Sequence, residues 1–251
     1  MKKTFASLAI LFISLCSLAQ SEDFQQAMNM GKEALSARQY GQAIQYFSLA
    51  VKLMPESREA SLKQMQSAIL KRDLSVFKSS ILKLEALNHP LSLNVYITYS
   101  QLAKKQRIYN DGLKMLEKAE EKHKKQKTIF LHRAAIFLKL NKKAEAIKSL
   151  NEALTLYPGS LDIIHKLANI YITISSLKSI SYFKKLLAEE FYKDAALTSL
   201  ALLYTNLYEE NPENNKSDLM QALSYYNQYI QRHPKNQETR AIIENIRIIL
   251  E

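Results

Sequence analysis

Apolar residues recur three and four positions apart along most of the chain, the spacing of a helix with one buried face. In the stretch "ARQYGQAIQYFSLAVKLMP", residues 37–55, two alanines flank a phenylalanine, at Ala43, Phe47 and Ala50, and the run closes on Pro55. A proline ends a helix because it lacks the backbone N–H and clashes with the preceding turn. This stretch therefore predicts an amphipathic helix that stops at the proline.

The same spacing returns twice, which indicates an internal repeat. The two further copies place it at Ala146, Leu150, Ala153 and Pro158, and at Ala222, Tyr226, Tyr229 and Pro234. The interval from Pro55 to Pro158 is close to three periods of about 34 residues. The sequence predicts six helix pairs and one closing helix, at about 24–57, 58–90, 91–126, 127–160, 161–192, 194–236 and 237–251.

The copies differ in detail. Gly31 and Ala134 stand at the same place in two first helices, where a small residue lets helices approach closely. In 58–90 larger residues take the tight places, at Met65, Phe77 and Leu84. The polar stretch 209–218 is an insertion, predicted as a loop or an extended helix end. In the closing helix one apolar face is expected, formed by Ile242, Ile243, Ile246, Ile249 and Leu250.

These residues resemble the tetratricopeptide repeat family, over about 24–236. The resemblance implies an all-α, right-handed superhelical solenoid of antiparallel helix pairs with a C-terminal capping helix. The tryptophan common in the family's first helices is absent, because the chain has none. The resemblance also implies a scaffold that binds a protein or peptide in the concave groove lined by the first helices.

The first residues predict export. Lys2 and Lys3 precede an uncharged apolar run and then small residues, the order of a secretory signal cleaved after Ala19. The protein would then be periplasmic or secreted, with no transmembrane segment in the mature chain. An uncleaved anchor over 4–21 is one alternative, since its length is at the lower edge of a spanning helix. A lipid on Cys16 is another, and would associate the protein with the envelope.

Composition and charge indicate a folded protein and limit the partners that it could bind. The chain has 251 residues with 47% hydrophobic and 24% charged, which suits a folded protein. Cleavage would remove two lysines and the single cysteine, lowering the net charge from +11 to +9. The basic run 117–127 is interpreted mainly as a solvated helix end, and alternatively as a patch for an acidic partner. Nucleic acid is not expected, because export removes that partner.

The sequence offers no catalytic motif. It has no HExxH, GxSxG or glycine-rich phosphate loop, and its five histidines do not stand at metal-ligand spacing. No enzyme activity, cofactor or metal is therefore expected.

Partner binding is assigned to polar positions on the groove side of the first helices. The candidates are Asn94, Thr98, Gln101, Thr128, His132, His165 and Asn169. Most tyrosines are expected in the core, whereas Tyr96, Tyr208 and Tyr225 are expected to add contacts to a partner. The alternative function is a structural subunit of an envelope machine, similar to tetratricopeptide lipoproteins of pilus or outer-membrane assembly.

Overall fold

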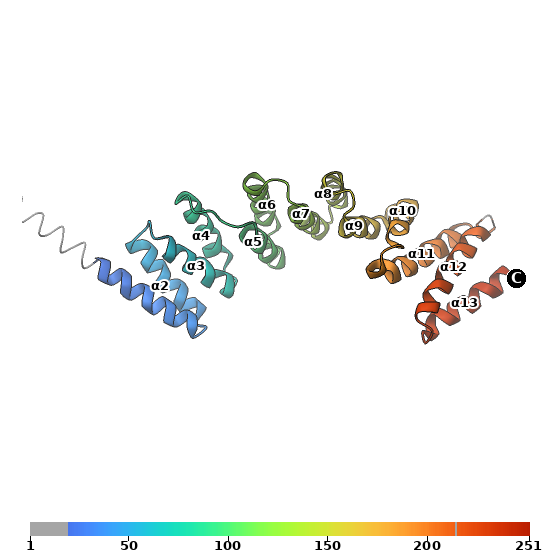
Figure 1. The fold of residues 1–251 in the computed structure, drawn as a ribbon, viewed down its shortest axis with the longest axis horizontal. Helices are drawn as coiled ribbons and strands as arrows, with labels where there is room; N and C mark the ends of the chain where they lie inside the picture. Colours follow the sequence, from blue (N-terminus) through green and yellow to red (C-terminus); the bar gives the residue numbers. More distant parts are fainter. Residues whose placement is uncertain (1–19, 214) are drawn as a thin grey trace, which may run out of the picture. The chain divides into compact units, whose positions relative to one another are not determined.

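The computed structural model describes residues 20–213 and 215–251. All regular secondary structure in these residues is helical, and they contain no β-strand. The chain forms two compact units (Figure 1): unit 1, described over 20–125, and unit 2, Gln126–Glu251. The predicted leader and Cys16 lie outside the described residues.

Unit 1 is built from three successive helix pairs, α1–α2, α3–α4 and α5–α6. Residues 20–36 are the described part of α1. The others are α2 (Tyr40–Leu53), α3 (Arg58–Lys71), α4 (Leu74–Ala86), α5 (Leu93–Lys105) and α6 (Tyr109–His123). Turns of two or three residues join the helices within each pair, so the two run antiparallel.

Unit 2 contains three more pairs and a last single helix. Its helices are α7 (Lys127–Lys139), α8 (Lys143–Leu156), α9 (Leu161–Tyr171), α10 (Ser176–Leu186), α11 (Glu190–Glu210), α12 (Lys216–Arg232) and α13 (Gln237–Leu250). The insertion predicted at 209–218 falls partly inside helices, since it completes α11 and begins α12. The all-α helix-pair fold expected from the sequence is confirmed.

The turns inside the first four pairs repeat a single backbone geometry. One residue in each of these four turns adopts the left-handed conformation, and the amide after it bonds back to the carbonyl five residues earlier. These left-handed residues are Arg38 (φ 59°), Arg72 (φ 62°), Arg107 (φ 63°) and Asn141 (φ 57°). The backbone bond satisfies carbonyls that a helix end leaves without a partner, so each first helix stops at an equivalent place.

Small residues stand where helices touch, as the repeat predicts. Ala43 and Ala50 are fully buried around Phe47, which is itself 0% exposed. A Cβ built on Gly31 would lie 2.6 Å from Cε1 of Phe47, closer than real contacts allow. Glycine is therefore required at 31 by the phenylalanine ring of the partner helix.

The second pair has its own small residues, which the sequence interpretation missed. Met65, Phe77 and Leu84 are buried as expected, but the buried serines Ser61, Ser67 and Ser80 lie beside them. The Ser80 hydroxyl donates to Gln64 Oε1 at 3.0 Å, and the Gln64 amide donates to the Ser48 hydroxyl at 2.8 Å. A polar chain thus joins α4, α3 and α2.

Two clusters of three polar side chains join α4 to α5 and α6. In the first, the cation is on α4 and the carboxylate on α6; in the second, these positions are exchanged. In the first, Lys78 donates to Asp111 at 2.9 Å, and the Tyr99 hydroxyl donates to the same carboxylate at 3.3 Å. In the second, Glu85 accepts from Lys118 and, at 2.8 Å, from the Tyr96 hydroxyl. We call them the Asp111 triad and the Glu85 triad. Each uses one side chain from each of the three helices.

The capping helix α13 covers unit 2 with part of the predicted face. Ile243 and Ile246 are buried against α12, and Ile242 and Leu250 are half-buried. The expectation for Ile249 was wrong, because this side chain is 48% exposed. Residues seven apart, such as Ile242 and Ile249, drift around a helix, so the later one turns away from the packed face.

Candidate functional site

The seven predicted partner residues lie on first helices of both units. Asn94, Thr98 and Gln101 are on α5 of unit 1, where Thr98 is half-buried and the other two are exposed. In unit 2, Thr128 and Asn169 are exposed, whereas His132 and His165 are half-buried; their helices are α7 and α9. Partner contact by these residues stays a prediction.

One hydrogen bond joins two of the predicted residues, within a single helix. The Asn169 side-chain amide donates to the main-chain oxygen of His165 at 2.8 Å. This bond satisfies one amide hydrogen of Asn169 inside α9. The exposed carbonyl oxygen and the second hydrogen are what Asn169 can offer to a partner.

His165 belongs to an aromatic cluster that the sequence interpretation did not find. Its ring lies 5.0 Å from the Tyr192 ring of α11 and 6.4 Å, edge-on, from the buried Phe183 ring of α10. Burial, together with nearby Lys166, lowers the pKa of His165 below 6.5. The imidazole is therefore neutral at pH 7, so His165 offers hydrogen bonding and a ring face to a partner rather than a positive charge.

Phe191 extends this cluster to the surface. Its ring is 4.9 Å from the Tyr192 ring, at 85°, and the residue is 89% exposed. We call Phe191, Tyr192, His165 and Phe183 the aromatic row, since successive rings are in contact from solvent to core. The signal in the sequence was the Phe-Tyr pair, which begins α11 at places where the repeat requires no aromatic residue.

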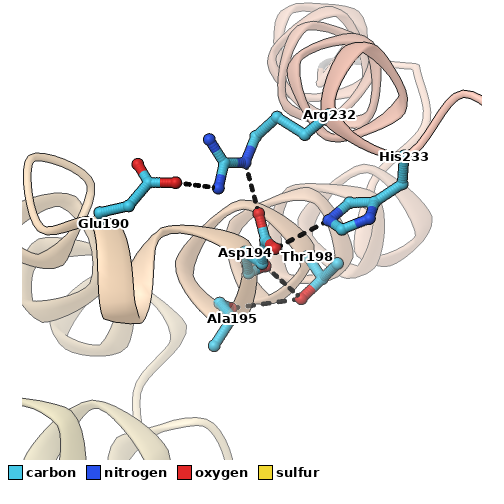
Figure 2. Close-up of polar contacts among 6 residues, drawn as sticks. All are labelled: Glu190, Asp194, Ala195, Thr198, Arg232 and His233. Atoms are coloured by element: carbon cyan, nitrogen blue, oxygen red, sulfur yellow. Dashed lines mark hydrogen bonds and ion pairs between the residues drawn. The ribbon is translucent and has the colours of Figure 1, made fainter.

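Charged side chains gather where the start of α11 meets the end of α12 (Figure 2). Arg232 Nε donates to Asp194 Oδ1 at 2.5 Å, and the same guanidinium pairs with Glu190. His233 Nε2 lies 2.7 Å from the second Asp194 oxygen. Asp194 therefore holds Arg232, the last residue of α12, and His233 directly after it, and Arg232 spans one turn of α11.

The electrostatics of this cluster favour the charged forms. The hydrogen bond from Arg232 is the main cause that lowers the pKa of Asp194, and it likewise lowers the pKa of Glu190. The Thr198 hydroxyl in Figure 2 donates to the main-chain oxygens of Asp194 and Ala195, at 2.9 and 3.3 Å. That hydroxyl is used inside its own helix, so the cluster joins two helices and does not form a catalytic triad.

Three tyrosines expected to contact a partner take part in packing, and for Tyr208 and Tyr225, which are half-buried, partner contact stays a prediction. Tyr96 is 0% exposed, and its hydroxyl donates to Glu85. Tyr225 stacks on Tyr204 with ring centroids 5.8 Å apart, and Tyr208 packs on the core between α11, α12 and α13. The expectation for Tyr96 was wrong. Its partner Glu85 lies on α4, in the preceding helix pair, and the residue spacing within one pair does not reveal contacts between pairs.

Several lysines of the basic run 117–127 form ion pairs with other helices, although the run was interpreted mainly as a solvated helix end. Lys118 and Lys122 pair with Glu85 in unit 1, the latter at 3.8 Å. In unit 2, Lys127 lies 3.2 Å from Asp162. These lysines form ion pairs with the neighbouring helix pair, whereas the sequence analysis considered only ion pairs within one helix.

The described residues contain neither a membrane-spanning helix nor a cluster of metal ligands. Across 20–213 and 215–251, no helix combines the length and the apolar character needed to cross a membrane. Over the same ranges, histidine, cysteine, aspartate and glutamate side chains form no group of three that could hold a metal ion.

Comparison with known proteins agrees with the geometry. Residues 100–160 match the family described as tetratricopeptide repeat. No curated protein matches the chain. Among solved structures, pilF of Pseudomonas aeruginosa is 15% identical, with a TM-score of 0.50 over 90% of this chain and 99% of that one.

Two other solved structures share the arrangement. YrrB, described as a TPR protein with an unusual peptide-binding site, is 15% identical, with a TM-score of 0.54 over 79% of this chain and 97% of its own. PilW, described as a widely conserved type IV pilus biogenesis factor, is 16% identical, with a TM-score of 0.51 over 90% and 98%. The chain thus has the fold of tetratricopeptide repeat proteins, and residues 100–160 match that family's sequence pattern.

Proposed function

We propose that the protein is an exported scaffold that binds another protein through the surface of unit 2 around the aromatic row. The observation that carries the proposal is Phe191, which is 89% exposed yet positioned by its contact with Tyr192. A ring that stays exposed adds nothing to the stability of the fold, but burying it under a partner contributes about 1.5–3 kcal/mol of binding free energy. Aromatic side chains of this kind dominate the binding energy of many interfaces.

The surroundings of Phe191 suit a protein interface. Leu202 is 52% exposed and lies three turns further along α11, which brings it to the same side of the helix. Glu190 precedes Phe191 at the start of α11 and pairs with Arg232, so this end of the helix also offers charged groups to a partner. The predicted residues His165 and Asn169 lie on α9, which the His165–Tyr192 contact joins to α11. An apolar centre with a polar rim is the usual composition of a non-obligate interface.

A pull-down from envelope extract tests the proposal, using the chain from Gln20 onward as bait. Phe191→Ala should lose the partner while melting like wild type, because truncating an exposed side chain changes stability by about 0.5 kcal/mol or less. The matched control is Leu177→Ala, since Leu177 is 72% exposed on a second helix, α10. Equal retention by both variants would show that Phe191 is not the contact.

The sequence alternative, a permanent subunit of an envelope machine, predicts a different outcome. The partner would then co-purify in fixed stoichiometry and resist dilution, whereas a transient partner dissociates on washing. Lipid on Cys16 would favour the permanent subunit.

Export is tested at the N-terminus of the protein. Lys2, Lys3 and the small residues before Gln20 support cleavage after Ala19. Mass spectrometry of the envelope fraction should find Gln20 as the first residue. An intact Met1 or a lipidated Cys16 there would contradict the cleaved signal and favour one of the other two N-termini.

A further inference from the structure

Three arginines occupy equivalent turns of unit 1 in a conformation that suits glycine. Arg38, Arg72 and Arg107 each hold the left-handed position between the two helices of a pair, with φ of 59°, 62° and 63°. A side chain with a Cβ crowds the backbone in this conformation, and glycine does not. The equivalent residue in the first turn of unit 2 is Asn141, which tolerates it better. Unit 1 therefore uses arginine where the backbone favours another residue.

No contact inside the chain accounts for these arginines. All three are exposed. Among the residues that the structure describes, no carboxylate pairs with any of the three guanidinium groups. The capping bonds explain why these turns are left-handed, but glycine would make the same bonds with less strain, so the choice of arginine points to a role outside the chain.

The neighbouring side chains make this edge more positive. Lys71 precedes Arg72, and Lys105 stands two positions before Arg107; both lysines are exposed. Asp73 is the carboxylate in the middle turn, and it caps α4 by accepting from the Val76 amide at 3.2 Å. Lys71 Nζ is 3.9 Å from that carboxylate, so Asp73 offsets one lysine and leaves Arg72 uncompensated.

We propose that these three turns, the arginine edge of unit 1, dock an acidic segment of a protein partner. The pairs α1–α2, α3–α4 and α5–α6 follow one another in the stack (Figure 1), and the turn inside each pair carries one of the arginines, so the three turns come in succession along unit 1. An extended acidic chain matches a line of cations, whereas a membrane surface needs cations spread over an area. Guanidinium also binds carboxylates with two parallel hydrogen bonds.

This inference rests on the proposed function, because it presumes a protein partner, and it adds the partner's charge and a second contact surface. The arginine edge belongs to unit 1 and the aromatic row to unit 2, so different variants test them. Each can be removed without touching the other.

The test variant is Arg38→Gly/Arg72→Gly/Arg107→Gly. Glycine takes the left-handed conformation without strain, so the change removes three charges and keeps the turns. The matched control is Lys178→Gln/Lys184→Gln/Lys185→Gln, which removes three charges from α10 of unit 2. These lysines are exposed and lie over tyrosine rings, at 5.3, 5.5 and 5.4 Å from the centroids. Circular dichroism verifies that both variants stay folded.

The probe is a fluorescein-labelled oligoglutamate peptide, with an oligoglutamine peptide of equal length as its neutral counterpart, followed by anisotropy. Wild type should bind oligoglutamate and not oligoglutamine, and binding should weaken as salt is raised. The glycine variant should bind about tenfold more weakly, as expected for three exposed ion pairs, and the lysine variant should stay within about twofold.

Three results would overturn the inference: unchanged binding by the glycine variant, equal losses in both variants, or binding of wild type to phosphatidylglycerol vesicles but not to oligoglutamate. Binding to the vesicles alone would show that the arginine edge of unit 1 contacts a membrane surface instead of a protein. The pull-down separates the two proposals. A partner retained equally by wild type and the glycine variant removes only the arginine edge, and no retained partner at all removes the proposed function.

Discussion

The hydroxyl of Tyr96 on α5 donates a 2.8 Å hydrogen bond to Glu85 on α4, and both groups lie inside unit 1. Tyr96 is fully buried and the Glu85 side chain is 12% exposed. Burial alone would raise the pKa of Glu85, but the hydrogen bonds from Lys118 and Tyr96 outweigh it, and the pKa lies below 4.5. A charged carboxylate is thus held between two helix pairs.

Tyr96→Phe should destabilise unit 1 by about 1.5–3 kcal/mol, the range for a hydrogen bond to a charged group. The measurement is the free energy of unfolding in urea. Tyr109→Phe is the matched control, because Tyr109 is half-buried on α6 and its hydroxyl bonds to no residue within 20–213 or 215–251. That control should change stability by less than about 0.5 kcal/mol. Equal effects would mean that the Glu85 bond adds nothing.

Unit 1 should lose stability as the pH falls through the acidic range. The pKa values of Glu85 and Asp111 are lowered from 4.5 and 3.8, the latter chiefly by the hydrogen bond from Lys78. A carboxyl group whose pKa is lowered by folding stabilises the protein above its unfolded pKa, and this contribution disappears as it protonates. Glu85→Gln should therefore be less stable than wild type at pH 7, and the difference should shrink as the pH falls below 4.5 and through the lowered pKa of Glu85.

The control for this pH series is Glu117→Gln, an exposed position on α6. It should follow the wild-type profile throughout. A Glu85→Gln profile parallel to wild type at every pH would contradict the role assigned to the carboxylate.

Gly31→Ala should destabilise the first pair by about 1–3 kcal/mol, because the new methyl group would meet the Phe47 ring at 2.6 Å. Gly159→Ala is the control, since nothing lies within 4 Å of a Cβ at that position. Combining Gly31→Ala with Phe47→Leu should cost less than the two separate losses together, because the smaller side chain leaves room. Additive losses in the double variant would show that the two positions do not compete for space.

Lys124→Gly should stabilise the protein by about 1 kcal/mol. Lys124 has φ 61° and ψ −173°, a backbone region that costs other residues on the order of 1–3 kcal/mol and glycine very little. Lys124→Ala removes the same charge but keeps the Cβ, so its stability should stay at the wild-type value. Thermal melts of the three proteins distinguish relief of strain from loss of charge.

Helix pairing was predictable from the sequence because it follows from residues near one another. The spacing of Ala43, Phe47 and Ala50, and the proline after them, already implies an amphipathic helix of a given length. Close approach at Gly31 followed from the same pattern. These features depend on residue size and period, which a single sequence displays directly.

The polar contacts between pairs were not predictable in this way. Tyr96 meets Glu85 only because α5 packs beside α4 at a particular height, and no rule of spacing fixes that height. Phe191 was missed for the opposite reason: it contributes nothing to the repeat, so a search for repeat positions passed over it. Partner surfaces are in general the positions that the fold leaves unused.

The two triads of unit 1 have a consequence for how α4 and α6 align. Lys78 and Glu85 are two turns apart on α4, as are their partners Asp111 and Lys118 on α6. If α4 slid two turns along α6 in one direction, Lys78 would face Lys118; in the other, Glu85 would face Asp111. Both displaced arrangements bring like charges together, so the opposite signs of the two triads favour the one observed alignment of α4 and α6 over either displaced one.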